Sequence, residues 1–66
     1  MVKIAPNEIA FKLKSSRRVR KIGLSGTQKA AFEGDKLFIR NFGELLFELN
    51  LAEIEWILLG NELKIR

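Results

Sequence analysis

Six bases within ten positions are the side chains with the clearest chemical potential in this 66-residue chain. No acid interrupts segment 12–21, whose bases are Lys12, Lys14, Arg17, Arg18, Arg20 and Lys21. Lysine and arginine neutralise phosphates and release counterions from nucleic acids, and a planar guanidinium can hold a phosphate through two hydrogen bonds. The segment therefore predicts binding to the backbone of RNA or single-stranded DNA, with little sequence discrimination. The alternative is a solvated loop whose charge serves solubility.

A second group of residues extends this predicted nucleic-acid site. A hairpin that turns at positions 34–35 places Phe38 on one face with Lys29, Lys36 and Arg40, because side chains alternate along a strand. An aromatic ring flanked by bases can stack an unpaired nucleotide. The alternative is that Phe38 packs against a second sheet or a second subunit.

The charge is divided unevenly along the chain. The 12 Lys+Arg outnumber the 8 Asp+Glu, which gives a net charge of +4. Residues 1–33 carry eight bases and two acids, and residues 34–66 carry four bases and six acids, so the two halves have net charges of +6 and −2. Such asymmetry indicates an anionic partner or a head-to-tail contact between copies.

The composition argues against several other classes of function. The chain has no Cys, His or Tyr, so disulfides, thiolate or imidazole metal sites and the commonest catalytic bases are missing. We expect no enzymatic activity, no cofactor and no bound metal. The segment 23–27 lacks the Lys of a phosphate-binding loop and is interpreted as a turn. The longest apolar run, 56–59, is too short to cross a bilayer, and we expect a cytoplasmic protein without a membrane segment.

The pattern of alternation predicts one all-β domain over residues 1–66. Strands are expected over 8–14, 19–24, 44–49 and the two arms of a hairpin over 29–40. One short helical turn near 51–54 precedes a sixth strand, and a turn at Gly60-Asn61 would pair Leu58 with Leu63 and Trp56 with Ile65. The alternative is a helix over 51–59, with Asn50 as its N-terminal cap and Gly60 as its C-terminal cap. About six short antiparallel strands suit a small barrel or sandwich, and closure into a barrel is favoured because it removes sheet edges.

Some strands are apolar on both faces, which predicts self-association. Alternation directs Leu45 inward on the 44–49 strand, and Trp56 and Leu58 inward on the last strand. Their neighbours then point outward, where a homo-oligomer or a partner would cover them. The alternative function is therefore a protein-binding regulator, inhibitor or assembly module. The predicted interface consists of Leu46, Ile57 and Leu59.

The C-terminal half resembles a known family at three places. The run 33–37, the segment 42–44 and Ile54 resemble the CooT-type small β-barrels, which are associated with nickel handling. The resemblance implies a small β-barrel. That family binds metal through a Cys directly after the initiator Met, and because this chain has Val2 there, no metal ligand is carried over.

Overall fold

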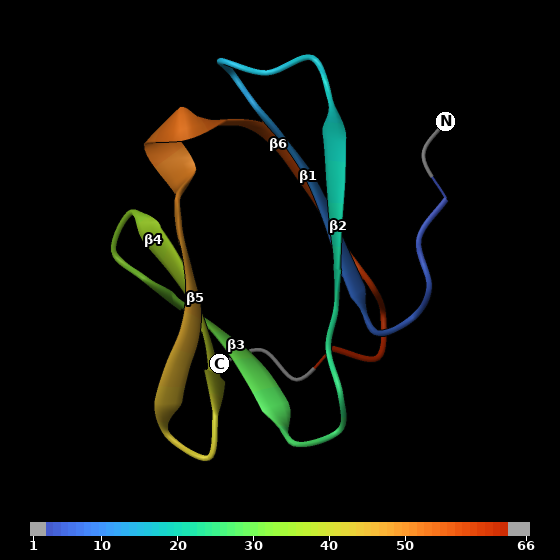
Figure 1. The fold of residues 1–66 in the computed structure, drawn as a ribbon, viewed down its shortest axis with the longest axis vertical. Helices are drawn as coiled ribbons and strands as arrows, with labels where there is room; N and C mark the ends of the chain where they lie inside the picture. The colour runs from blue at the N-terminus through green and yellow to red at the C-terminus, as the bar shows by residue number, and fades with distance from the viewer. Residues whose placement is uncertain (1–2, 64–66) are drawn as a thin grey trace.

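Six antiparallel strands form two three-stranded sheets in the computed structural model, which describes residues 3–63 (Figure 1). The order is β2-β1-β6 in one sheet and β3-β4-β5 in the other. The all-β prediction is confirmed. Among residues 3–63 no strand pairing joins the sheets, so the closed barrel that we expected is not formed. The elements are β1 (Glu8–Leu13), β2 (Val19–Gly23), β3 (Gln28–Glu33), β4 (Lys36–Asn41), β5 (Glu44–Asn50), the 3₁₀ turn η1 (Leu51–Glu53) and β6 (Ile54–Leu59).

The hairpin of β3 and β4 forms in the predicted register. Phe32 pairs with Leu37, Ala30 with Ile39 and Ala31 with Phe38. Gly34 has a φ of 63°, which suits the first central position of a two-residue primed turn. The sequence prediction succeeds here because the two-residue loop at Gly34-Asp35 fixes which residues of the two arms face each other.

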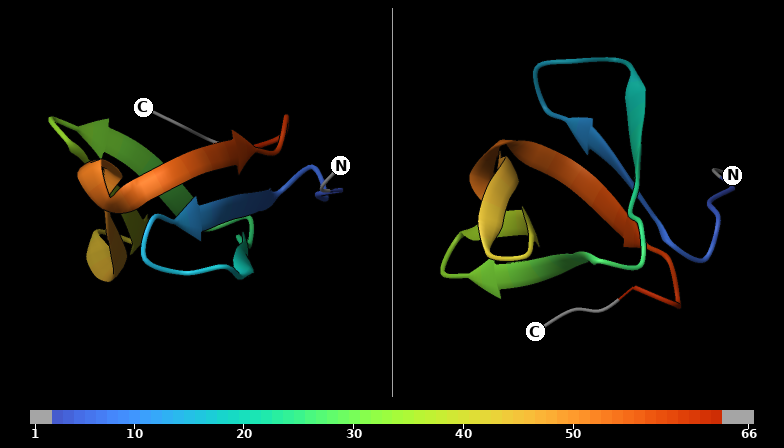
Figure 2. Two further views of the ribbon diagram at one scale, coloured as in Figure 1. Left: turned by 90° about the horizontal axis from the view of Figure 1, so that it is seen from above. Right: turned by 60° about the horizontal axis from the view of Figure 1, so that its bottom comes forward.

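The core lies between the two sheets, which cross at an angle (Figure 2). A tilted aromatic contact joins them, because Phe11 of β1 and Phe47 of β5 have ring centroids 6.5 Å apart and planes inclined by 52°. β1 is the central strand of its sheet and contributes the largest fully buried side chain, that of Phe11. The buried cluster consists of Ile9, Phe11, Leu24, Ala30, Leu37, Ile39, Leu49 and Ile54.

A bulge in β5 reverses the predicted alternation. Ile39 pairs with Phe47 and the next residue, Arg40, pairs with Leu45, so Leu46 is an extra residue without a partner in β4. Leu45 consequently lies on the outer face with Arg40 and is 50% exposed. The prediction that Leu45 points inward is wrong, whereas Leu46 is exposed as expected.

A second irregularity reverses the faces of β6. Lys12 pairs with Trp56 and Leu13 with Ile54, which leaves Glu55 as the extra residue. Beyond this shift Ile57 pairs with Phe11 and packs against the core. The predicted inward side chain of Leu58 is 42% exposed instead. The prediction that Ile57 points away from the core is therefore wrong, and Leu59 lies on the same side as Ile57 but stays exposed.

The prediction for the segment before β6 is confirmed, whereas the prediction for the segment after it is wrong. The Asn50 side chain accepts a hydrogen bond from the Ala52 amide at 3.1 Å and caps η1, so the predicted helical turn is confirmed. After β6, the amide of Gly60 donates to Glu8 O and the amide of Glu62 donates to Pro6 O, both at 2.8 Å. Residues 60–62 therefore lie beside the segment that precedes β1 and do not turn back along β6. The expected pairing of Leu58 with Leu63 is wrong. The expected pairing of Trp56 with Ile65 lies outside the described residues.

Candidate nucleic-acid interface

The basic hairpin, which we define as residues 12–21, projects at one end of the molecule (Figure 1). It contains the end of β1, the connecting loop and most of β2. No Asp or Glu occurs between residues 9 and 32. Within residues 3–63, five of its six bases make no ion pair. These five exposed bases are Lys14, Arg17, Arg18, Arg20 and Lys21.

Local hydrogen bonds shape the loop that carries two of these bases. The Ser16 amide donates to Leu13 O at 3.1 Å, and the Ser16 hydroxyl accepts from the Arg18 amide at 3.1 Å. A serine that binds the backbone two residues ahead produces a tight turn. Arg17 therefore lies within a turn whose backbone is held at both ends, and its exposed side chain is free to contact a ligand.

The hairpin gathers the bases at one end but distributes them over both of its faces. Arg20 pairs with Phe11 and Lys21 with Ala10, so these two neighbouring bases point to opposite faces. Lys21 donates to Lys3 O at 2.7 Å. Lys12 differs from the other five, because its ammonium lies 2.8 Å from a Glu55 carboxylate oxygen. The predicted contribution of Lys12 to anion binding is thus offset by a carboxylate of the same chain.

The second predicted group, on β3 and β4, is mostly compensated by acids. Lys36 lies 3.9 Å from Glu48, and the Arg40 guanidinium donates to Glu33 at 2.9 Å. The same guanidinium lies 4.9 Å from the centre of the Phe38 ring. An arginine in this position makes a cation–π contact that covers one face of the ring. The Phe38 ring is therefore less accessible for stacking by a nucleobase than the sequence predicts.

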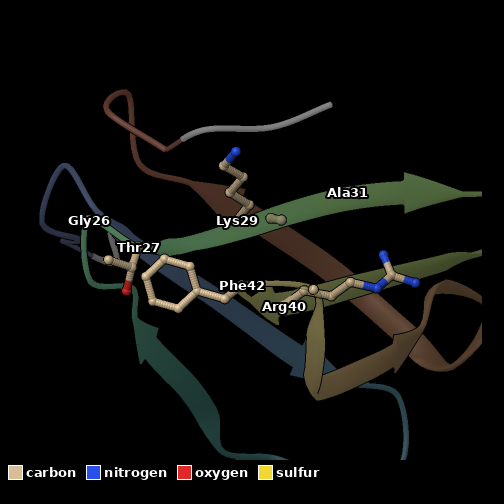
Figure 3. A pocket seen from close by; sticks show the side chains of 8 residues that line it. Gly26, Thr27, Lys29, Ala31, Arg40 and Phe42 are labelled. Atoms are coloured by element: carbon tan, nitrogen blue, oxygen red, sulfur yellow. The ribbon is translucent and has the colours of Figure 1, made fainter.

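A pocket of about 390 Å³ lies next to this group, where the β2–β3 loop meets β3 and the β4–β5 turn (Figure 3). Figure 3 shows the Phe42 ring extended toward Thr27, with the Lys29 side chain rising from β3. The Arg40 guanidinium is directed away from the ring. Lys29 is exposed and has no ion pair in the part of the chain that the structure describes. The lining residues are Gly26, Thr27, Lys29, Ala30, Ala31, Arg40, Phe42 and Gly43.

Phe42 is the functional candidate that sequence reasoning missed. Its φ is 51° and that of Gly43 is 82°, and positive φ at both central positions is the pattern of a type I′ turn. Asn and Gly favour this conformation, whereas for a bulky residue a positive φ is an outlier. Phe42 is nevertheless 85% exposed. The sequence signal was an aromatic residue directly before Gly43 in a turn too short to bury it.

The strain at Phe42 has a measurable consequence for stability. Because Asn tolerates a positive φ, Phe42→Asn should raise the free energy of unfolding by about 1 kcal/mol. For a domain of this size, that corresponds to an increase in melting temperature of about 4–8 °C. Thermal unfolding followed by circular dichroism measures the shift. A melting temperature equal to or below that of the wild type would show that the Phe42 conformation costs nothing.

Other types of site receive no support from the described part of the structure. Between residues 3 and 63 no helix has the length and apolar character that a membrane span requires. The same residues contain no group of three or more side chains suited to hold a metal ion. No protein-family model, curated protein or solved structure matches the chain.

Proposed function

We propose that this protein binds single-stranded nucleic acid, without catalysis, through the phosphate contacts of its basic hairpin. The observation that supports the proposal is the group of five exposed bases that make no ion pair among residues 3–63. Three of them are Arg17, Arg18 and Arg20, whose guanidinium groups suit bidentate contact with phosphate. The acids of the chain compensate Lys12, Lys36 and Arg40 instead. Among residues 3–63, five of the seven bases without an ion pair therefore lie on this hairpin, and the other two are Lys3 and Lys29.

The distribution of these bases over both faces favours a flexible single strand over a rigid duplex. A single strand can bend around the projecting hairpin, so that its phosphates contact lysine and arginine side chains on both faces of the hairpin. Each neutralised phosphate releases counterions, which lowers log K by about 0.7 for each tenfold rise in salt per contact with a single strand. Binding should consequently be strongly dependent on salt and tolerant of sequence.

A polarisation titration with a labelled single-stranded oligonucleotide, as RNA and as DNA, tests the proposal. The variant Arg17→Ala/Arg18→Ala should bind about tenfold or more weakly and flatten the salt slope by roughly 1.4, since two phosphate contacts are lost. The double variant Lys3→Ala/Lys36→Ala is the matched control, because it removes the same charge outside the basic hairpin. Its salt slope should stay close to that of the wild type.

Three outcomes would contradict the proposal. The first is the absence of binding to either oligonucleotide at low salt with tens of micromolar protein. The second is an equal loss in both double variants, which would mean that net charge alone attracts the nucleic acid. Tighter binding to a duplex of the same sequence would contradict the preference for single strands.

A second candidate function is the capture of a protein partner, or of another copy of this chain, by the exposed leucines of β5. Leu45 and Leu46 are both exposed beside the Phe42 turn, and exposed apolar clusters mark interaction surfaces. Of the three interface residues predicted from the sequence, Leu46 and Leu59 remain available, whereas Ile57 packs against the core. Size-exclusion chromatography with light scattering would report a dimer that Leu46→Asp dissociates. A monomer at 100 μM or so would contradict self-association.

A further inference from the structure

The pocket beside Phe42 combines a small floor, an aromatic wall and one uncompensated cation. Ala31 has only a methyl side chain at the lining, Ala30 is buried beneath it, and the ring of Phe42 extends along one side toward Thr27 (Figure 3). Its volume of about 390 Å³ lies within the range of small-molecule sites, about 300–1,000 Å³. These dimensions suit a flat ring system lying against Phe42.

The conformation of Phe42 is a separate observation that points to a ligand. A bulky residue at positive φ costs stability, and at this turn position Asn would avoid the cost. Little packing within residues 3–63 offsets the cost, because 85% of Phe42 is accessible to solvent. Strained residues concentrate at sites that bind ligands. A contact between the ring and a bound molecule would account for this strain.

The charge at the pocket is suited to one anionic group. Arg40 is held by Glu33 at 2.9 Å and by the Phe38 ring, and its guanidinium points away from Phe42 (Figure 3). Lys29 is left as the exposed cation without an ion pair among residues 3–63. An ammonium on a flexible stem can reach a phosphate near the ring. A planar ring with an adjacent phosphate is the chemistry of a nucleotide.

The pocket follows directly after the basic hairpin along the chain. β2 carries Arg20 and Lys21 and leads through the 24–27 loop to Gly26 and Thr27 at the pocket. In Figure 1, β2 runs downward from the basic hairpin at the top toward this loop at the bottom. A single nucleic-acid strand lying along β2 would thus extend from the exposed lysines and arginines of the basic hairpin to the Phe42 ring.

We infer that the Phe42 pocket takes one unpaired nucleobase of the bound strand, stacked on Phe42, with its neighbouring phosphate at Lys29. This inference rests on the proposed function and specifies the part of the ligand that the pocket contacts. Stacking does not depend on which base is present, because every base has a π-face. The pocket therefore increases the affinity for a strand that carries nucleobases relative to a strand without them. The basic hairpin supplies the contacts to phosphate.

The test compares an ordinary single-stranded oligonucleotide with an abasic strand of equal length, each titrated against the intact chain by polarisation. The wild type should bind the base-containing strand about 5- to 150-fold more tightly than the abasic strand. Phe42→Asn removes the ring, and Ala31→Leu fills the floor of the pocket. Both variants should lose most of this preference and retain the salt slope of the wild type. Leu58→Ala, which removes an exposed apolar side chain outside the pocket lining, is the control that should keep the preference.

The outcomes separate the inference from the proposed function. If Phe42→Asn and Ala31→Leu keep the full preference for bases, the pocket inference fails, whereas salt-dependent binding by the basic hairpin stands. If the wild type binds neither strand, the proposed function fails and the inference fails with it. If Phe42→Asn changes the oligomeric state in light scattering while both affinities stay unchanged, the ring contacts a second copy of the chain, and the assignment to a base is wrong.

Discussion

Replacing Phe11 by alanine should lower the free energy of unfolding by about 3–5 kcal/mol, the largest effect that we expect from a single substitution. Phe11 is fully buried in the central strand β1 and contacts Phe47 of the other sheet. The substitution would remove the ring that joins the two sheets and leave a cavity that neither sheet can easily close. A domain of this length has a total stability of roughly 3–10 kcal/mol, so much of the variant should be unfolded at 25 °C.

Urea unfolding followed by the fluorescence of Trp56 measures this loss. Phe32→Ala is the matched control, since it removes the same ring from a position that is 38% exposed on the inner side of β3. Its cost should be clearly smaller, at roughly 1–2 kcal/mol. Equal costs for the two substitutions would show that Phe11 is not the principal contact between the sheets.

Gly60→Ala should destabilise the domain by about 3 kcal/mol, at the upper end of the usual cost of overpacking. A Cβ atom at this position would overlap the backbone oxygen of Pro6 and lie 2.6 Å from the backbone oxygen of Ala5. Backbone atoms cannot rotate away as a side chain can. To make room, the segment before β1 would have to move and weaken the hydrogen bonds that Gly60 and Glu62 donate to Glu8 and Pro6.

The control for this prediction is Gly23→Ala, because a Cβ there has no atom within 4 Å. That substitution should change the stability by less than about 1 kcal/mol and in the favourable direction, since alanine restricts the unfolded chain. The two melting temperatures provide the measurement. A Gly60→Ala melting temperature within a degree of the Gly23→Ala value would mean that the approach of Pro6 to Gly60 is not required for folding.

The parts of the fold that depend on local signals could be predicted from the sequence. The β3–β4 hairpin follows from the two-residue turn at Gly34, and η1 follows from the capping side chain of Asn50. The faces of β5 and β6 could not be predicted in the same way. One extra residue in each strand, Leu46 and Glu55, reverses the alternation beyond it, and a bulge depends on pairing with a distant strand.

The same distinction between local signals and contacts with distant segments applies to the candidate site. The basic hairpin is visible as a run of bases without an acid, and the structure places five of them at the surface. The partners that compensate the other bases come from distant segments, as Glu55 does for Lys12, so composition cannot identify them. Phe42 was missed because a pattern of residue types gives neither a φ angle nor an exposed fraction. The pocket likewise arises only when the 24–27 loop, β3 and the β4–β5 turn come together.

β2 is an edge strand of its sheet, and this position gives its basic residues, Arg20 and Lys21, a second role. Within residues 3–63, β2 pairs with β1 alone, so its other side offers unused backbone donors and acceptors. Lysine and arginine on such a border discourage another chain from adding a strand there, because like charges meet and solvated side chains must be dehydrated. Arg20 and Lys21 would thereby protect the protein against amyloid-like growth.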